Sequence, residues 1–135
     1  MTALPPYAEL LGLVAEPQAG GPAVLAMPFG DDVLGRPGFL HGGAIAGLLE
    51  MAAIVALTHA LEGERGGRIK PVNVTVDYMR GGRDKPTRAI GIVTRLGTRV
   101  ANVEAVAWQD DRAKPIAAAR MNYLIVRDEN GVTSG

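Results

Sequence analysis

Residues 41–61 read HGGAIAGLLEMAAIVALTHAL, and this stretch decides the fold. Its segment 44–61 is rich in Ala, Leu and Met, contains no proline, and is long enough for about five helical turns. Apolar side chains fall on every side of such a helix, which indicates burial. A membrane span is the alternative, but a span needs ~20 strongly apolar residues, and Glu50 interrupts this one. We therefore expect a buried central helix.

Alternating apolar and polar residues predict strands after this helix. The predicted strands cover residues 72–78, 87–96, 99–108 and 114–126. Because short turns join them, they should form an antiparallel meander, and only the central helix is available to cover its apolar face. Before the helix, residues 6–13 resemble a short helix and residues 23–29 a further strand. The expected fold class is α+β, a sheet wrapped around one long helix.

Length and composition exclude several other classes. The 135 residues suit a single domain, 1–135, with a core at about 23–126 and a polar tail at 128–135. Fourteen basic residues balance fourteen acidic ones without a basic block, so neither nucleic acid nor a membrane is expected as a partner. The absence of cysteine excludes thiol chemistry, and two histidines argue against a metal site. The N-terminus lacks the features of a signal peptide, so we expect a cytoplasmic protein.

Glu50 is the most informative candidate for chemistry, because it is the only ionisable side chain in residues 44–58. Burying a carboxylate inside an apolar helix costs free energy unless something compensates. Two interpretations stay open. Glu50 is a general base or nucleophile, or it is a structural glutamate that reaches solvent or pairs with an arginine.

His41, Gly42 and Gly43 lie where the helix should begin. Glycines there let a ligand approach unpaired N–H groups at the positive end of the helix dipole, which suits an oxyanion, although paired glycines are also common in turns. Eight residues separate Gly42 from Glu50, roughly 12 Å along the axis. One carbonyl cannot touch both. If both act in one reaction they come from different subunits, and the site lies at a dimer interface.

The stretch GFLHGGAIAGLLEM at residues 38–51, with a Glu nine residues after the His and strands downstream, resembles the hotdog-fold acyl-CoA thioesterases, in particular the PaaI-like branch. The Glu at this helix position is similar to that of the 4-hydroxybenzoyl-CoA thioesterases. The resemblance covers residues 23–126 and implies a hotdog fold and thioester hydrolysis. It implies no cofactor, since coenzyme A is part of the substrate. It also implies a homodimer, with dimers often paired into tetramers.

Matched by position, the resemblance also implies roles for single residues. The Gly42 N–H would donate to the thioester carbonyl, and Glu50 of the partner subunit would activate water or attack directly. His41 would shape the loop or contact the substrate. The remaining substrate-binding candidates are Gly43, Asn73 and three arginines placed to meet the nucleotide phosphates, Arg80, Arg95 and Arg99. Solvated arginines at strand ends are the alternative for the last three.

Two positions depart from the family pattern. Gly35 stands where PaaI-like enzymes commonly have Asn, six residues before the His. The Ser or Thr that often places the water has no clear counterpart, and Asn73 and Thr75 are the candidate substitutes. A non-catalytic acyl-CoA-binding protein is therefore the alternative function. A hydratase or dehydratase of this fold would need a second motif that the sequence does not contain. The acyl group and the choice between dimer and tetramer stay open.

Overall fold

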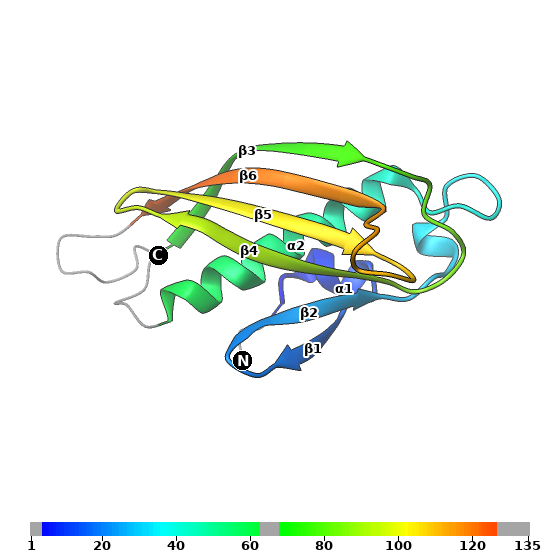
Figure 1. The fold of residues 1–135 in the computed structure, drawn as a ribbon, viewed down its shortest axis with the longest axis horizontal. Coiled ribbons are helices and arrows are strands. Elements are labelled where there is room, and N and C mark those ends of the chain that lie inside the picture. Colours follow the sequence, from blue (N-terminus) through cyan, green and yellow to red (C-terminus); the bar gives the residue numbers. More distant parts are fainter. Residues whose placement is uncertain (1–3, 63–67, 127–135) are drawn as a thin grey trace.

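The computed structural model describes residues 4–62 and 68–126, which form one antiparallel sheet with a long helix on one face (Figure 1). The predicted α+β architecture is confirmed, whereas the predicted polar tail lies outside the described residues. In chain order the elements are α1 (Pro6–Leu10), β1 (Val14–Gln18), β2 (Gly21–Met27), a 3-10 turn (Asp31–Val33), α2 (Gly42–Leu61), β3 (Arg68–Tyr78), β4 (Thr87–Leu96), β5 (Val100–Trp108) and β6 (Ala117–Val126).

The strand order is β1-β2-β4-β5-β6-β3, and neighbouring strands are antiparallel. Strands β4, β5 and β6 form a meander as predicted. The prediction is wrong for β3, which pairs with β6 and lies at the edge of the sheet. The reason is that β2 already occupies the other side of β4, where Leu25 pairs with Ala89 and Met27 with Thr87.

The element bounds follow local chemistry. The prediction of 87–96 matches β4, and α2 begins two residues before the predicted helix. Strand β6 begins later than predicted because a turn, closed by the Lys114 N–H donating to Asp111 O at 2.9 Å, precedes it. Strand β3 begins earlier because its pairing with β6 continues past an irregularity between Pro71 and Asn73. The short edge strand β1 was not predicted, since it contains Pro17, which only an edge tolerates well.

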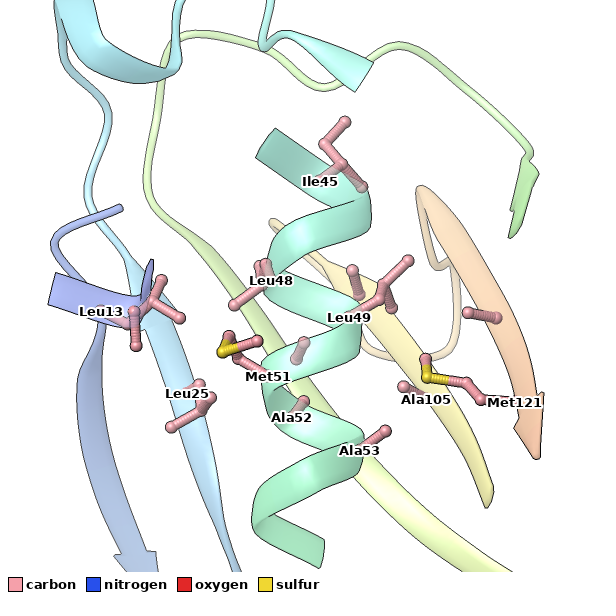
Figure 2. Close-up of a cluster of buried hydrophobic side chains, with 14 of the residues drawn as sticks. Leu13, Leu25, Ile45, Leu48, Leu49, Met51, Ala52, Ala53, Ala105 and Met121 are labelled. Carbon is pink, nitrogen blue, oxygen red and sulfur yellow. The ribbon is translucent and has the colours of Figure 1, made fainter. Parts of the chain in front are cut away.

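Helix α2 lies across the sheet over β2, β4 and β5, and reaches β6 only at its margin. Figure 2 shows its apolar side chains packed on both sides, with Met51 directed toward Leu25 on β2 and Leu49 toward Met121 on β6. The helix backbone comes very close to β4, since a Cβ on Gly91 would lie 2.4 Å from Ala52 O. By length and composition α2 could cross a membrane, but 61% of that apolar window is buried inside the protein, as in a core helix.

The inner face of β3 is apolar but only partly covered: Ile69 and Val76 pack against the core, while its other apolar residues are exposed. Val74 and Tyr78 lie opposite Met121 and Ala117 of β6, so the predicted alternation is present. However, Val74 is 50% exposed and Tyr78 is 53% exposed, because α2 does not extend over the edge of the sheet. The expectation that the central helix covers this strand is therefore wrong. Among the described strands β3 has β6 as its only neighbour, so its other edge is open.

Candidate active site

The first turn of α2 leaves one backbone amide without an acceptor. His41 caps the helix in an extended conformation, and its Nδ1 accepts a hydrogen bond from the Gly43 N–H at 2.9 Å. Its carbonyl accepts from the N–H groups of Ala44 and Ile45, at 3.0 and 3.2 Å. The Gly42 N–H donates to no group in residues 4–62 or 68–126. This amide lies at the positive end of the helix dipole, where it can bind an incoming oxygen atom.

Gly43 allows the cap to form. A Cβ at this position would lie 3.0 Å from His41 Nδ1 and 3.1 Å from its Cε1, so a side chain would push the imidazole away from the amide. Because Nδ1 accepts the hydrogen bond, the neutral ring carries its proton on Nε2. His41 therefore orders the helix start and keeps one N–H donor on an exposed ring.

Tyr78, the last residue of β3, holds the same turn from the other side. Its hydroxyl donates to Gly42 O at 2.9 Å, and its ring carbons lie 3.6 Å from the place a Gly42 Cβ would take. The first turn of α2 is thus tied to the end of the edge strand. The sequence indicates only that Tyr78 ends a predicted strand, residues 72–78. A hydrogen bond between residues 36 positions apart has no local sequence signal.

Glu50 lies two turns further along α2 and is half-buried. Ala46 and Ile54, one turn before and one turn after it, are also half-buried, so this stripe of the helix is apolar apart from the carboxylate. Glu50 forms no ion pair with any described residue, which excludes pairing with an arginine in that part of the chain. The alternative of a structural glutamate that reaches solvent stays open.

The surroundings of Tyr123 show which side of α2 carries this carboxylate. Tyr123 is buried on β6, and its hydroxyl donates to Met121 Sδ at 3.3 Å. Burial raises the pKa of Tyr123 above its usual value, and the negative charge of Glu50 adds to that rise. The carboxylate therefore lies on the β6 side of α2, toward the open edge that β3 forms.

Gly42 and Glu50 are separate within one protomer. Helix α2 is continuous over both, so its rise places them roughly 12 Å apart along the axis. The C=O bond of a thioester is far shorter than this separation, so one carbonyl cannot reach both groups. One protomer can thus offer a given carbonyl either the amide or the carboxylate, and a site shared by two subunits stays a prediction.

The structure places Asn73 on the outer face of the sheet, away from α2. Its side-chain oxygen accepts a hydrogen bond from Asn122 Nδ2 at 2.8 Å, and the Asn122 oxygen in turn accepts one from Asn102. Thr75 lies on the same outer face, opposite a β6 residue. Neither Asn73 nor Thr75 is brought close to Gly42 in the same protomer.

The three predicted arginines fall into two groups. Arg80 follows β3 by two residues, and its backbone N–H donates to Ile116 O at 3.2 Å. It therefore lies in the loop next to Tyr78 and the first turn of α2. Arg95 and Arg99 lie at the β4–β5 turn, at the end of the sheet opposite to the start of α2 (Figure 1). Within one protomer only Arg80 is near Gly42.

Gly35 has a steric role in the loop before His41. A Cβ at this position would lie 3.0 Å from His41 Cα and 3.2 Å from Leu40 O, both backbone atoms. The Gly35 N–H donates to Phe39 O at 2.9 Å, which closes the loop back onto itself. Glycine at position 35 thus lets the backbone pass close to His41 on its way into the helix cap.

The other end of α2 carries a histidine and a glutamate, His59 and Glu62. A cavity of about 210 Å³ there lies between the β1–β2 hairpin and the helix, with Pro22, Val55 and His59 in its lining. His59 Nδ1 lies 3.9 Å from Glu62 Oε2, one helical turn away. Within the described part of the chain no three His, Asp or Glu side chains are grouped so that they could hold a metal ion.

Comparison with known proteins places these features in a family. Residues 37–116 match the family model described as the thioesterase superfamily. A solved structure of a protein from Chromobacterium violaceum is 36% identical, with a TM-score of 0.73, and the match covers 92% of this chain and 85% of that one. A search of curated proteins finds no significant match.

Two further structures show the same fold. A phenylacetic acid degradation-related protein from Ralstonia eutropha, described as a putative thioesterase, is 23% identical, with a TM-score of 0.78 over 91% of this chain and 92% of that one. A thioesterase from Haemophilus influenzae is 18% identical, with a TM-score of 0.78 over 89% of this chain and 82% of that one. The predicted hotdog fold is therefore confirmed.

Proposed function

The chain belongs to the thioesterase superfamily, whose family model covers more than half of it, and on this premise we propose that it hydrolyses an acyl-CoA thioester to a free acid and coenzyme A. The observation that carries the proposal is the Gly42 N–H, which has no acceptor among the described residues and lies at the positive end of α2. An amide held in this way stabilises the negative charge that develops on a carbonyl oxygen during acyl transfer.

In the proposed reaction, the thioester oxygen binds the Gly42 N–H of one subunit, and Glu50 of the partner subunit acts from the other side. As a general base, the carboxylate takes a proton from water while the water oxygen bonds to the carbonyl carbon. The tetrahedral oxyanion then collapses, the carbon–sulfur bond breaks, and the thiolate of coenzyme A leaves and takes up the proton. The steps require no metal and no further cofactor.

Direct attack by Glu50 is the second route to the same products. The carboxylate oxygen would form an anhydride with the acyl group and release the thiolate, and water would then cleave the anhydride. A single turnover in ¹⁸O-labelled water distinguishes the routes. The first-turnover acid contains the label if Glu50 acts as a base. In the direct route, water that attacks the Glu50 carbonyl carbon of the anhydride leaves the solvent oxygen in the Glu50 side chain, and the first-turnover acid takes an unlabelled Glu50 oxygen instead.

The geometry supports a homodimer as the active unit, because one protomer holds the two groups roughly 12 Å apart. The apolar inner face of β3 and its open edge provide a surface for the dimer contact. Val74 and Tyr78 on this face are each about half exposed. We expect these dimers to associate further into tetramers, and we expect the protein to act in the cytoplasm.

Thiol release from a panel of acyl-CoA esters tests the proposed reaction. Glu50→Gln keeps the size of the side chain but removes the base, so kcat should fall by roughly 10²–10⁴-fold. Glu62→Gln, at the end of the same helix, is the matched control and should keep the activity of the parent. Equal rates of thiol release from the parent and from Glu50→Gln would contradict the proposal.

A non-catalytic acyl-CoA-binding protein is the second candidate function, and Gly35 is the observation that favours it, because the family commonly has Asn there. The same panel separates the two functions. A parent protein that binds acyl-CoA esters but releases no thiol from any of them would support the binding function and overturn hydrolysis.

A further inference from the structure

Basic side chains line a cleft of about 170 Å³ between the loop after β3 and the turn before β6. Asp110 and Asp111 also line it, but both are engaged within the protein. Asp110 Oδ2 accepts from Lys85 Nζ at 2.6 Å, and Asp111 Oδ1 accepts from the Ala113 N–H at 2.9 Å. Four cations against two carboxylates leave the cleft with a positive charge; the four are Arg80, Arg83, Lys85 and Lys114.

Arg83 also takes part in a stack with a second arginine. Its Cζ lies 4.4 Å from the centre of the Phe39 ring, and the Cζ of Arg36 lies 4.1 Å from the same centre. Neither of these arginines, nor Arg80, forms an ion pair with a described residue. Stacking orders a guanidinium group while its N–H donors stay available at the edge, and this arrangement suits the oxygen atoms of a phosphate.

The loop after β3, which forms one wall of the cleft, also runs beside the segment that leads into α2. The Leu40 N–H donates to Gly82 O at 2.9 Å, so the loop after β3 runs beside the segment that leads into His41. The same loop begins at Tyr78, whose hydroxyl binds Gly42 O. A ligand with its reacting end at Gly42 therefore has the cleft beside it in the same protomer. In Figure 1 this loop passes the start of α2, while the β4–β5 turn lies at the far end.

We propose that this cleft and the Arg36–Phe39–Arg83 stack bind the phosphate groups of the coenzyme A nucleotide while the thioester lies at Gly42. This rests on the proposed function, because it takes coenzyme A as the carrier of the acyl group. It assigns the nucleotide to Arg80 and Arg83 of the subunit that supplies the Gly42 amide. The phosphates give the substrate several negative charges, and Arg is the side chain best suited to bind them in pairs of hydrogen bonds.

Equilibrium binding of coenzyme A and of pantetheine, which lacks the nucleotide, tests this assignment without requiring catalysis. Arg83→Gln should weaken coenzyme A binding by roughly tenfold and leave pantetheine binding unchanged. Arg83→Lys keeps the charge but loses the paired donors, so it should lie between Arg83→Gln and the parent. Arg112→Gln is the matched control, since Arg112 also stacks on an aromatic ring, that of Trp108 at 5.1 Å, but does not line the cleft.

The assignment is overturned if the parent binds coenzyme A no more tightly than pantetheine, if Arg83→Gln weakens both ligands equally, or if Arg112→Gln has the same effect as Arg83→Gln. A further result would also overturn it: acyl carrier protein displaces only pantetheine-type ligands, and Arg83→Gln leaves the affinity for coenzyme A unchanged. Thiol release from a pantetheine thioester separates this result from failure of the proposed function. If the parent releases thiol from this thioester and Glu50→Gln does not, the proposed hydrolysis stands even where the assignment of the cleft fails.

Discussion

Four hydrogen bonds hold the first turn of α2 around the Gly42 amide. His41 Nδ1 occupies the neighbouring N–H of Gly43, the His41 carbonyl occupies the next two N–H groups of the helix, and Tyr78 holds the Gly42 carbonyl. The remaining N–H, that of Gly42, is held in position by these neighbours and lies at the positive end of the helix dipole before any substrate arrives. A donor that does not need to reorganise during the reaction stabilises an oxyanion more than a mobile one.

The sequence predicted part of this constellation. Gly42, His41 and Glu50 follow from a glycine pair before an apolar helix and from one carboxylate inside it. Tyr78 and Arg83 could not be found this way, because Tyr78 meets Gly42 and Arg83 meets Phe39 only where segments far apart in the sequence lie together. A local sequence pattern identifies functional groups that lie on one helix or strand. Groups that come together from distant segments can be identified only from the tertiary structure.

Tyr78→Phe tests the positioning role of the hydroxyl. Losing this hydrogen bond frees the Gly42 carbonyl, so we expect kcat to fall by roughly three- to tenfold while KM changes little. Tyr7→Phe is the control, because the Tyr7 ring lies against α2 at Gly47 without a hydrogen bond to a described residue. Steady-state kinetics of both variants provide the measurement. An unchanged kcat in Tyr78→Phe would show that the Tyr78 hydroxyl does not position the Gly42 amide.

Gly35→Asn tests whether the departure from the family Asn limits activity. We expect the restored Asn to lower kcat, because its Cβ would press on the His41 backbone at 3.0 Å and displace the cap. Gly30→Asn is the control, since nothing lies within 4 Å of a Cβ there. A higher kcat in Gly35→Asn would contradict the steric explanation and show that the family side chain fits this loop.

The helix and strands were predicted more reliably than the way they pair. Alternating apolar and polar residues predicted β4 with the bounds that the structure has, and Val74 and Tyr78 do lie on one face of β3. This alternation could not show that β2 pairs with β4 on the side away from β5. Because β2 takes that position, β3 lies at the edge of the sheet beside β6. Apolar alternation predicts which face a strand turns inward, but it does not predict whether anything in the same chain covers that face.

Gly91→Ala tests the close contact between α2 and the sheet. The added methyl group would lie 2.4 Å from Ala52 O, so the helix has to shift, and we expect the free energy of unfolding to fall by roughly 1–3 kcal/mol. Gly21→Ala is the control, because a Cβ there meets nothing within 4 Å. Thermal and urea denaturation of both variants provide the measurement. Equal stability of Gly91→Ala and the parent would show that the helix does not rest on β4 this closely.

Two surfaces of the protomer are those that the proposed dimer would use. The half-buried stripe of α2 around Glu50 is apolar, and the β3 edge presents an open strand with apolar residues on its inner face. A second copy placed against β3 would cover this face and would bring one subunit's amide toward the other's carboxylate. In this account one arrangement explains both the exposed apolar surface and the roughly 12 Å between the two reactive groups.

Mixing two inactive variants tests the shared site most directly. Gly42→Pro removes the amide proton at the first helical position, where proline fits and where His41 already has the extended conformation that precedes proline. Glu50→Gln removes the carboxylate. After random exchange of subunits, about half of the dimers are mixed and each contains one intact site, so we expect about a quarter of the parent's thiol release to return. No recovery, with mixed dimers demonstrated by mass spectrometry, would contradict a site built from two subunits.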